Sequence, residues 1–461
     1  MMPVPAKYRS LITNLLLLAL GAVYVQYCRD GVQEFHHYIN GYSMDVLYQI
    51  CIYITGALLI WFGKTSRWTL PIIFVVALAA RVVCIAHPAF LSSDLYRYVW
   101  DGKVQAAGIN PYRYIPADDH LRFLRDNAIY PNINRKDYAH TIYPPFAQML
   151  FWAVTRISAT EAGMKTAMVA FEALTCWALM QMLELLHRRR EEVLLYAWHP
   201  LCVWEIGSSG HIDAAAIALI TVAAWAILRN KPARSAVWLT LAALIKMYPA
   251  LLLLSFGRRL TWKIVAMCSV IVAISYAIYS SVGTGVLGFL GPYSREERLN
   301  TGERYFVLAW LHRYLHVPEA PQLYIIGAIL TLVGCGIWSW RRMRSPMQIL
   351  RIELAISVVI TILFSPHYPW YFLWTLPLAI VCSYLPAIVL TLDAVYWYAT
   401  DIAIPGQKMF RMNEYMYSIF LGALVFDLTW RWLQRRRKVS VITGADLSER
   451  VDSEKMEAEE A

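Results

Sequence analysis

The sequence has little charge and lacks several features that mark soluble or secreted proteins. Only 16% of its 461 residues are Asp, Glu, Lys or Arg, against about 25% in an average soluble domain. Its eight cysteines contain no CxxC pair and lie mostly in apolar segments, which argues against a disulfide framework and a metal site. No small-residue cleavage site follows the apolar run Leu11–Val25, so we expect that run to be retained as a membrane span.

Apolar segments dominate what remains. Hydrophobic residues make up 58% of the chain, and windows near the length of a bilayer span recur along it. We therefore predict an all-α, polytopic integral membrane protein of about 11 to 13 transmembrane helices. Short basic clusters account for the net charge of +10 and mark cytoplasmic ends, so we expect no nucleic-acid partner. The clusters are His187–Arg190, Arg258–Arg259, Arg341–Arg344 and Arg435–Lys438.

The order of segments predicts one membrane domain over residues 1–438, with two long outer loops at 87–146 and 281–321. Tail residues 439–461 are polar and are expected to be disordered and cytoplasmic. The first outer loop is rich in aromatic residues, and ordered loops of such length usually carry function. Segment Tyr143–Ile157 is expected to dip into the membrane without crossing, since a crossing would place the next basic cluster outside.

Two apolar hairpins in the middle of the chain are interrupted by polar residues. Val193–Glu205 and Ile212–Leu228 are joined by GSSGH, and Val237–Leu244 and Leu251–Phe256 flank KMYP. Proline breaks a helix, and non-helical backbone at membrane depth is tolerated where it lines a cavity or packs in protein. These breaks predict a buried polar cavity.

The first outer loop opens with a helix start at Ser92–Ser93. In one interpretation its carboxylate Asp94 acts as a general base. In the other, Asp94 complements the helix amino terminus and Arg97 pairs with Asp101. Both remain open from these residues alone. The residues expected on one face of this helix are Asp94, Arg97, Tyr98, Asp101 and Gln105.

Several ionisable residues lie in or against apolar segments. Lys246 has no acidic neighbour in sequence; such a lysine costs at least about 2.5 kcal/mol in the membrane and needs a partner or an anionic ligand, for which phosphate is the natural candidate. His211 and Asp213 either contact a ligand or pair with each other to lock their hairpin, and His367 has the same two interpretations. Arg304, with its loop, is an ordinary surface charge unless the loop folds back over the cavity.

Six motifs between Ser92 and Trp374 together resemble the GT-C superfamily of polyprenyl-phosphate-sugar-dependent glycosyltransferases, and most closely its bacterial mannosyltransferase-like branch. The order and spacing of the motifs carry the resemblance. They read SSDLYRYVWDGKVQAAGINPYRY, TIYPPFAQ, GHIDA, LIKMYPALL, NTGERY and SPHYPWYFLW.

The resemblance implies an inverting transfer of a sugar, with mannose expected, from a polyprenyl-phosphate donor to a hydroxyl of a lipid- or glycan-linked acceptor. The reaction would face the extracytoplasmic side of a bacterial inner membrane, among membrane lipids. Asp94 would be the catalytic base, and Lys246, Arg304 and His367 would stabilise the departing phosphate. The full set of expected donor-phosphate or substrate-binding residues is Arg97, Tyr98, Asp101, Tyr143, His211, Asp213, Lys246, Arg304 and His367.

This sequence departs from relatives of that kind in two respects. Two further spans precede the first outer loop, and Asp94 follows a serine where some relatives have a second acidic residue. The lone carboxylate predicts no certain metal or other cofactor; a divalent cation at Asp94 with Asp101 or Asp118 stays open.

Two other functions are compatible with a polytopic membrane protein that has a long outer loop and a buried polar cavity. A lipid or solute transporter often shows matching broken helices in two related halves, whereas both breaks here lie in the middle of the chain with no second half that mirrors them. A ligase or polymerase of lipid-linked glycans would share the loop and cavity but use a whole glycan as donor. The sequence therefore favours the glycosyltransferase.

Overall fold

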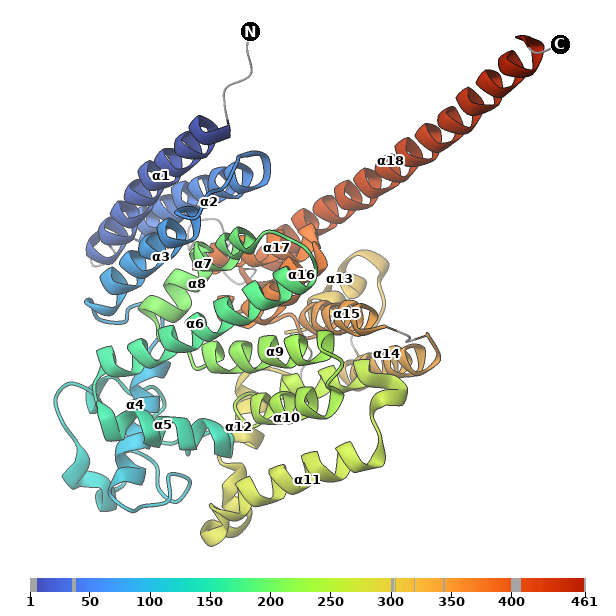
Figure 1. The fold of residues 1–461 in the computed structure, drawn as a ribbon. Coiled ribbons are helices and arrows are strands. Elements are labelled where there is room, and N and C mark those ends of the chain that lie inside the picture. Colours follow the sequence, from blue (N-terminus) through green and yellow to red (C-terminus); the bar gives the residue numbers. More distant parts are fainter. Residues whose placement is uncertain are drawn as a thin grey trace.

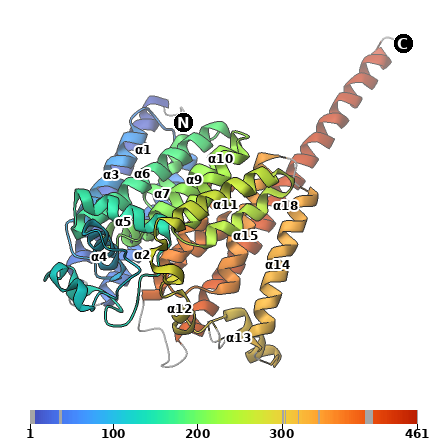
Figure 2. The same cartoon turned by 90° about the horizontal axis from the view of Figure 1, so that it is seen from below.

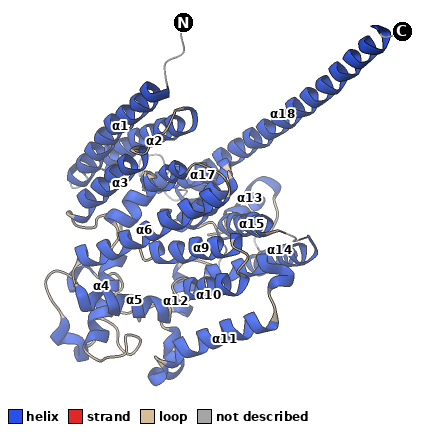
Figure 3. Ribbon diagram, in the orientation of Figure 1, coloured by secondary structure: helices blue, strands red, loops and turns tan. Residues whose placement is uncertain are grey.

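The computed structural model describes residues 6–34, 39–299, 302, 304–318, 320–342, 345–398 and 408–459, and its elements are all helical (Figure 3). No strand occurs in these ranges. The predicted all-α class is confirmed.

Three long helices form an amino-terminal group on one side of the molecule (Figure 1). They are α1 (Ala6–Glu34), α2 (Ile39–Phe62) and α3 (Thr69–Ile85), with α1 packed against both others. Polar residues fix the end of this group: Asn14 Nδ2 donates to Ser66 Oγ (2.8 Å), and Thr69 Oγ1 donates to Asn14 Oδ1 (2.8 Å). The start of α3 is therefore tied to α1 within an otherwise apolar interface.

The first outer loop is ordered and largely helical. Its helices are α4 (Asp94–Ala106), η1 (Asp119–Leu124), η2 (Tyr130–Asn132) and α5 (Pro145–Ile157). Helix α4 begins where the two serines predicted it would. Helix α5 has 13 residues and so is about 20 Å long, too short for a hydrocarbon core of about 30 Å. Its length fits the expected dip.

The middle of the chain contains both predicted breaks. The elements are α6 (Glu161–Leu185), η3 (Arg190–Val193), α7 (Leu194–Ala197), α8 (Pro200–Cys202), η4 (Val203–Ser208), α9 (Asp213–Leu228), α10 (Pro232–Ala243) and η5 (Tyr248–Arg259). The π-helix η4 ends before α9, and α10 ends before η5. Helix α9 packs between α6 and α10 and is buried along nearly its whole length.

The second break is held by α5. The backbone N–H groups of Phe146 and Ala147 donate to the carbonyl oxygen of Leu244 (3.0 and 3.1 Å). The first N–H groups of a helix have no partner within it, so α5 finds one at the carboxyl end of α10. This contact brings Tyr143 and Lys246, on either side of it, into one region.

The remaining elements follow α10 and η5 in the sequence. They are α11 (Trp262–Ala277), η6 (Ser280–Leu287), α12 (Leu290–Glu296), α13 (Phe306–Leu315), α14 (Pro321–Arg342), α15 (Pro346–Phe364), η7 (Pro369–Thr375), α16 (Leu376–Cys382), α17 (Leu385–Asp393), η8 (Ala394–Tyr398) and α18 (Lys408–Glu459). Helix α18 projects away from the other helices (Figures 1 and 2). It continues through most of 439–461, the segment that the sequence predicts to be disordered.

Within the described residues, five helices are long and apolar enough to cross a membrane, or six if a pair bent by 111° is one span. Four more apolar helices are shorter, among them α3 and α9. The polytopic membrane architecture is confirmed, but fewer helices are individually long enough than the expected 11 to 13. Apolar windows such as α9 are buried inside the protein, so they need not match the bilayer thickness.

A buried ion pair joins the amino-terminal group to the middle of the chain. Arg81 Nε and a terminal guanidinium nitrogen of Arg81 each lie 3.0 Å from an oxygen of Glu172, and both side chains are almost fully buried. Such pairs need good geometry and further hydrogen bonds to offset desolvation. Arg81 supplies two more, to the carbonyl oxygens of Ala197 (2.5 Å) and Ala77 (3.4 Å). This pair fixes α3 against α6 and α7.

Candidate active site

A cavity of about 390 Å³ lies where the first outer loop meets the second break and the carboxyl-terminal half of the chain. Five of the predicted site residues line it: Asp94, Arg97, Tyr143, Lys246 and His367. The other five, Tyr98, Asp101, His211, Asp213 and Arg304, are buried and do not line it. Five of the predicted residues therefore form part of the cavity wall, and the other five are buried outside that wall.

Asp94 combines the two interpretations that the sequence left open. It is the first residue of α4, where a carboxylate complements the helix dipole, and it also lines the cavity, half-buried. Asn134 Nδ2 donates to Asp94 Oδ1 (2.7 Å), and the backbone N–H of Asp94 donates to Ser92 Oγ (3.3 Å). These contacts hold the carboxylate at the cavity wall.

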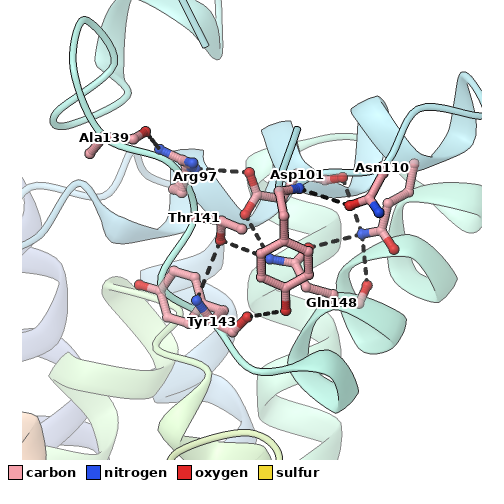
Figure 4. Close-up of polar contacts among 9 residues, drawn as sticks. Arg97, Asp101, Asn110, Ala139, Thr141, Tyr143 and Gln148 are labelled. Atoms are coloured by element: carbon pink, nitrogen blue, oxygen red, sulfur yellow. Dashed lines mark hydrogen bonds and ion pairs between the residues drawn. The ribbon is translucent and has the colours of Figure 1, made fainter. Parts of the chain in front are cut away.

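Arg97 and Asp101 form the pair expected across one helical turn. Arg97 Nε lies 2.8 Å from Asp101 Oδ1, and another guanidinium nitrogen donates to the Ala139 carbonyl oxygen (3.1 Å). The second oxygen of Asp101 accepts from Gln148 Nε2 (2.9 Å), which also donates to Thr141 Oγ1 (2.8 Å). Figure 4 shows this network linking α4, α5 and the end of the loop. Asp101 is thus a positioning group for Arg97.

Lys246 has the buried partner that its sequence position required. Its Nζ lies 3.1 Å from Asp213 Oδ2, and Asp213 is fully buried at the start of α9. The ammonium also lies over the rings of Tyr371 (5.0 Å) and Tyr143 (5.8 Å). A cation paired with a buried carboxylate therefore lies at the second break and lines the same cavity as Asp94.

The alternative pairing of His211 with Asp213 is wrong, because Asp213 pairs with Lys246. His211 Nε2 instead lies 3.4 Å from Glu205 Oε2, and Tyr398 donates its hydroxyl to the other oxygen of Glu205 (2.7 Å). The His211 ring stacks on Trp370 at 3.9 Å between centroids. Since Trp370 lines the cavity, His211 supports the wall from behind.

The second outer loop folds back against the cavity, and Arg304 is buried rather than an ordinary surface charge. It forms an ion pair with Glu297, whose carboxylate also lies 3.6 Å from His367 Nε2. Burial, and next the charge of Arg304, lower the pKa of His367 to about 4. His367 is therefore neutral at pH 7 and offers a hydrogen bond rather than a charge.

Sequence reasoning missed several wall residues. Asn134 and Arg135 come from the loop; Arg135 Nε lies 2.7 Å from Glu296 Oε2. Glu205 was detectable, since a carboxylate in an apolar segment is a functional candidate by itself. The motif SPHYPWYFLW contains part of the aromatic wall, but the sequence could not show that its rings meet those of distant segments. The aromatic residues that line the cavity are Phe289, Tyr293, Tyr368, Trp370, Tyr371, Trp397 and Tyr398.

The divalent cation that the sequence left open at Asp94 with Asp101 or Asp118 stays a prediction. Asp101 is engaged by Arg97 and Gln148, while Asp118 Oδ1 lies 2.7 Å from His120 Nδ1. Over the part of the chain that the structure describes, no three His, Cys, Asp or Glu side chains are grouped to hold a metal.

Comparison with known proteins shows the family of the chain. No curated protein and no solved structure matches the chain. A family model described as alpha-(1->6)-mannopyranosyltransferase, N-terminal domain, matches residues 16–262. The match includes Asp94, Arg97, Tyr143 and Lys246, and ends before the aromatic residues of the carboxyl-terminal half. Since it covers more than half of the sequence, the chain belongs to the alpha-(1->6)-mannopyranosyltransferase family and is a membrane glycosyltransferase.

Proposed function

We propose that this protein transfers mannose, with inversion, from a polyprenyl-phosphate donor to a hydroxyl of a lipid- or glycan-linked acceptor on the extracytoplasmic side of a bacterial inner membrane. One observation carries the proposal: the carboxylate of Asp94 and the ammonium of Lys246 line the same cavity beside a membrane-spanning helix bundle. A proton acceptor and a phosphate-binding cation are the two groups that this reaction needs.

The reaction takes one displacement. Asp94 accepts the proton of the acceptor hydroxyl while that oxygen bonds to the anomeric carbon of mannose. The bond from the anomeric carbon to the phosphate oxygen breaks, and polyprenyl phosphate leaves with the electron pair. Lys246 stabilises the charge that develops on the phosphate. A single carboxylate suffices, unlike the two carboxylates of glycoside hydrolases.

The charge pattern of the wall supports a phosphate ligand. Arg97, Arg135 and Lys246 line the cavity, whereas their partners Asp101, Glu296 and Asp213 do not. Arg97 and Arg135 keep guanidinium nitrogens beyond those that bond their carboxylates. Among the described residues that line the cavity, Asp94 is the one carboxylate, so this part of the wall presents more positive than negative groups.

The aromatic wall supports a sugar ligand. Tyrosine and tryptophan combine an apolar ring face with a polar edge, which suits the C–H face and the hydroxyls of a hexose. Tyr143 and Tyr371 place their rings beside Lys246. A mannosyl group could then stack on aromatic residues while its phosphate meets the cation.

The direction of α15 supports an extracytoplasmic site. Helix α14 ends with Arg341 and Arg342, and α15 runs from Pro346 to Phe364, just before the cavity residue His367. Basic ends of spans face the cytoplasm. A 19-residue apolar helix that starts at this basic end therefore supports a cavity at the opposite side of the membrane.

The experiment uses purified full-length protein and two labelled donors, polyprenyl-phosphate mannose and a nucleotide-activated mannose, with lipid and glycan acceptors. We expect transfer from the lipid donor alone, with inverted configuration in the product by NMR. Sealed vesicles of known orientation then report the side. Transfer from the nucleotide donor, retention of configuration, or product on the cytoplasmic face would contradict the corresponding part of the proposal.

A further inference from the structure

A second cavity, of about 720 Å³, is lined by Gln105, whose side-chain amide donates to the carbonyl oxygen of Gln148. Loop residues 108–114, helix α5 and the segment after α11 line it. Building on the proposed function, we propose that this cavity binds a neutral oligosaccharide, the glycan part of the acceptor.

The lining has the chemistry of a neutral saccharide site. It contains the side-chain amides of Gln105 and Asn110 and the rings of Tyr114 and Trp152, and no Asp or Glu is among the described residues that line it. Trp152 is 46% exposed, so its ring is available for stacking. The amide oxygens of Asn110 and Gln105 each accept one hydrogen bond within the protein and keep a second lone pair for a sugar hydroxyl, and aromatic rings offer faces to sugar C–H groups.

Other ligand classes fit the lining less well. A phosphate group is held by several cations or backbone donors, whereas Arg113 is the one Lys or Arg among the described residues that line this cavity. The Tyr114 ring stacks in parallel on His120 at 4.6 Å, which adds a second flat surface for a sugar ring.

The polar groups of this cavity are held in place before any ligand binds. Asn110 Nδ2 donates to the Tyr279 carbonyl oxygen (3.0 Å) and to Ser281 Oγ (2.9 Å), while its Oδ1 accepts from the Tyr112 N–H (3.1 Å). Tyr279 donates its hydroxyl to Gln105 Oε1 (2.9 Å). Preorganised groups lose less entropy on binding, so this arrangement suits ligand recognition.

Two connections join the cavities. In the first, Gln105 Nε2 donates to Gln148 Oε1 (3.0 Å), Gln148 donates to Asp101, and Asp101 holds Arg97 on the wall of the active-site cavity. Figure 4 shows the Gln148–Asp101–Arg97 part of this path. A sugar in the second cavity would therefore contact groups that position the catalytic wall.

The second connection uses tyrosines. The ring of Tyr279 packs edge-on against Tyr112 at 5.4 Å, and the Tyr112 hydroxyl donates to the Tyr143 carbonyl oxygen (2.6 Å). Tyr143 lines the active-site cavity. Binding of the acceptor glycan beside this junction would hold it next to the site of transfer, so the KM for longer acceptors should be lower than for short ones.

The test measures binding of α-linked mannotetraose to purified full-length protein by calorimetry. We expect Trp152→Ala to weaken binding about tenfold, the loss of one stacking face, and to raise the KM for long acceptors more than for short ones. The matched control is Trp262→Ala, since Trp262 is 75% exposed on α11 and lines neither cavity. It should bind and transfer as the wild type does.

Asp94→Asn separates this inference from the proposed function. This variant should bind mannotetraose as the wild type does, even if it no longer transfers mannose. If it binds mannotetraose and also transfers mannose at the wild-type rate, the proposed catalytic mechanism is wrong, but the saccharide site in the second cavity is not contradicted. Equal mannotetraose affinity in Trp152→Ala and Trp262→Ala would overturn the inference. So would a Trp152→Ala variant that loses binding to phospholipid vesicles and keeps binding to the saccharide, because the occupant would then be lipid.

Discussion

Replacing Lys246 by methionine tests its two roles at once. The ammonium of Lys246 lies 3.1 Å from Asp213 Oδ2. The Asp213 side chain is fully buried, and the Lys246 side chain is only 12% exposed. Loss of the cation leaves a buried carboxylate without its partner, which costs about 3 to 5 kcal/mol of stability. Loss of a charged hydrogen bond to the donor phosphate costs a further 1.5 to 3 kcal/mol of binding, roughly 10- to 150-fold in affinity.

The double variant Lys246→Met with Asp213→Leu separates these costs. Replacing both members of a buried pair by apolar residues is often nearly neutral for stability, so we expect the unfolding midpoint in detergent to recover. Donor affinity and turnover should stay low, because no cation remains beside the phosphate. Affinity is measured by titration with labelled polyprenyl-phosphate mannose, and acceptor affinity serves as the internal control. Recovery of donor affinity together with stability would show that Lys246 only balances Asp213, and would refute the reasoning.

Three further changes test the surrounding structure. Arg81→Met isolates the buried Glu172, so we expect about 3 to 5 kcal/mol lower stability in detergent unfolding, largely restored by adding Glu172→Met. Gly102→Ala places a methyl group 2.5 Å from a backbone oxygen of α5, and the same assay should show a loss of about 1 to 3 kcal/mol. Burial and the charge of Arg304 lower the pKa of His367 to about 4 in the folded protein, below its usual value of about 6.5. The free energy of unfolding should therefore fall as the pH falls from about 6.5 toward 4, because the unfolded chain binds a proton that the folded protein does not. His367→Gln should flatten the pH profile of unfolding over this range.

Each of these changes has its own contradiction. If adding Glu172→Met to Arg81→Met does not restore stability, then α3 and α6 are held by more than the ion pair. Gly334→Ala, where added atoms meet open space, is the control for Gly102→Ala; equal losses would refute the close crossing of α4 and α5. An unchanged unfolding profile between pH 4 and 6.5 in His367→Gln would show that this histidine is not held neutral.

Local sequence signals predicted the elements that depend on local chemistry. The serines before Asp94 marked the start of α4, and both polar interruptions appear as breaks in the structure. The unpaired Lys246 predicted a partner or ligand, because an isolated charge at that position is too costly. The sequence could not identify Asp213 as that partner, since their contact depends on how α9 and α10 pack.

Long-range packing also explains the errors and omissions. Helix α9 is apolar all round because protein covers it on every side, so hydropathy cannot separate it from a lipid-facing span. Asn134, which holds Asp94, lies in an irregular part of the loop without a periodic pattern. The aromatic wall is assembled from α12 and from residues 368–371 and 397–398, which only the fold brings together.

The most direct measurement is single-turnover mannose transfer by purified Asp94→Asn, with donor affinity measured on the same sample. The amide keeps the size of the carboxylate but cannot accept the proton, so we expect the rate to fall by about 10²- to 10⁴-fold with donor affinity and unfolding midpoint near those of the wild type. Asp119→Asn, an exposed carboxylate of the same loop, should transfer normally. A rate for Asp94→Asn equal to that of Asp119→Asn would contradict a catalytic role for this carboxylate.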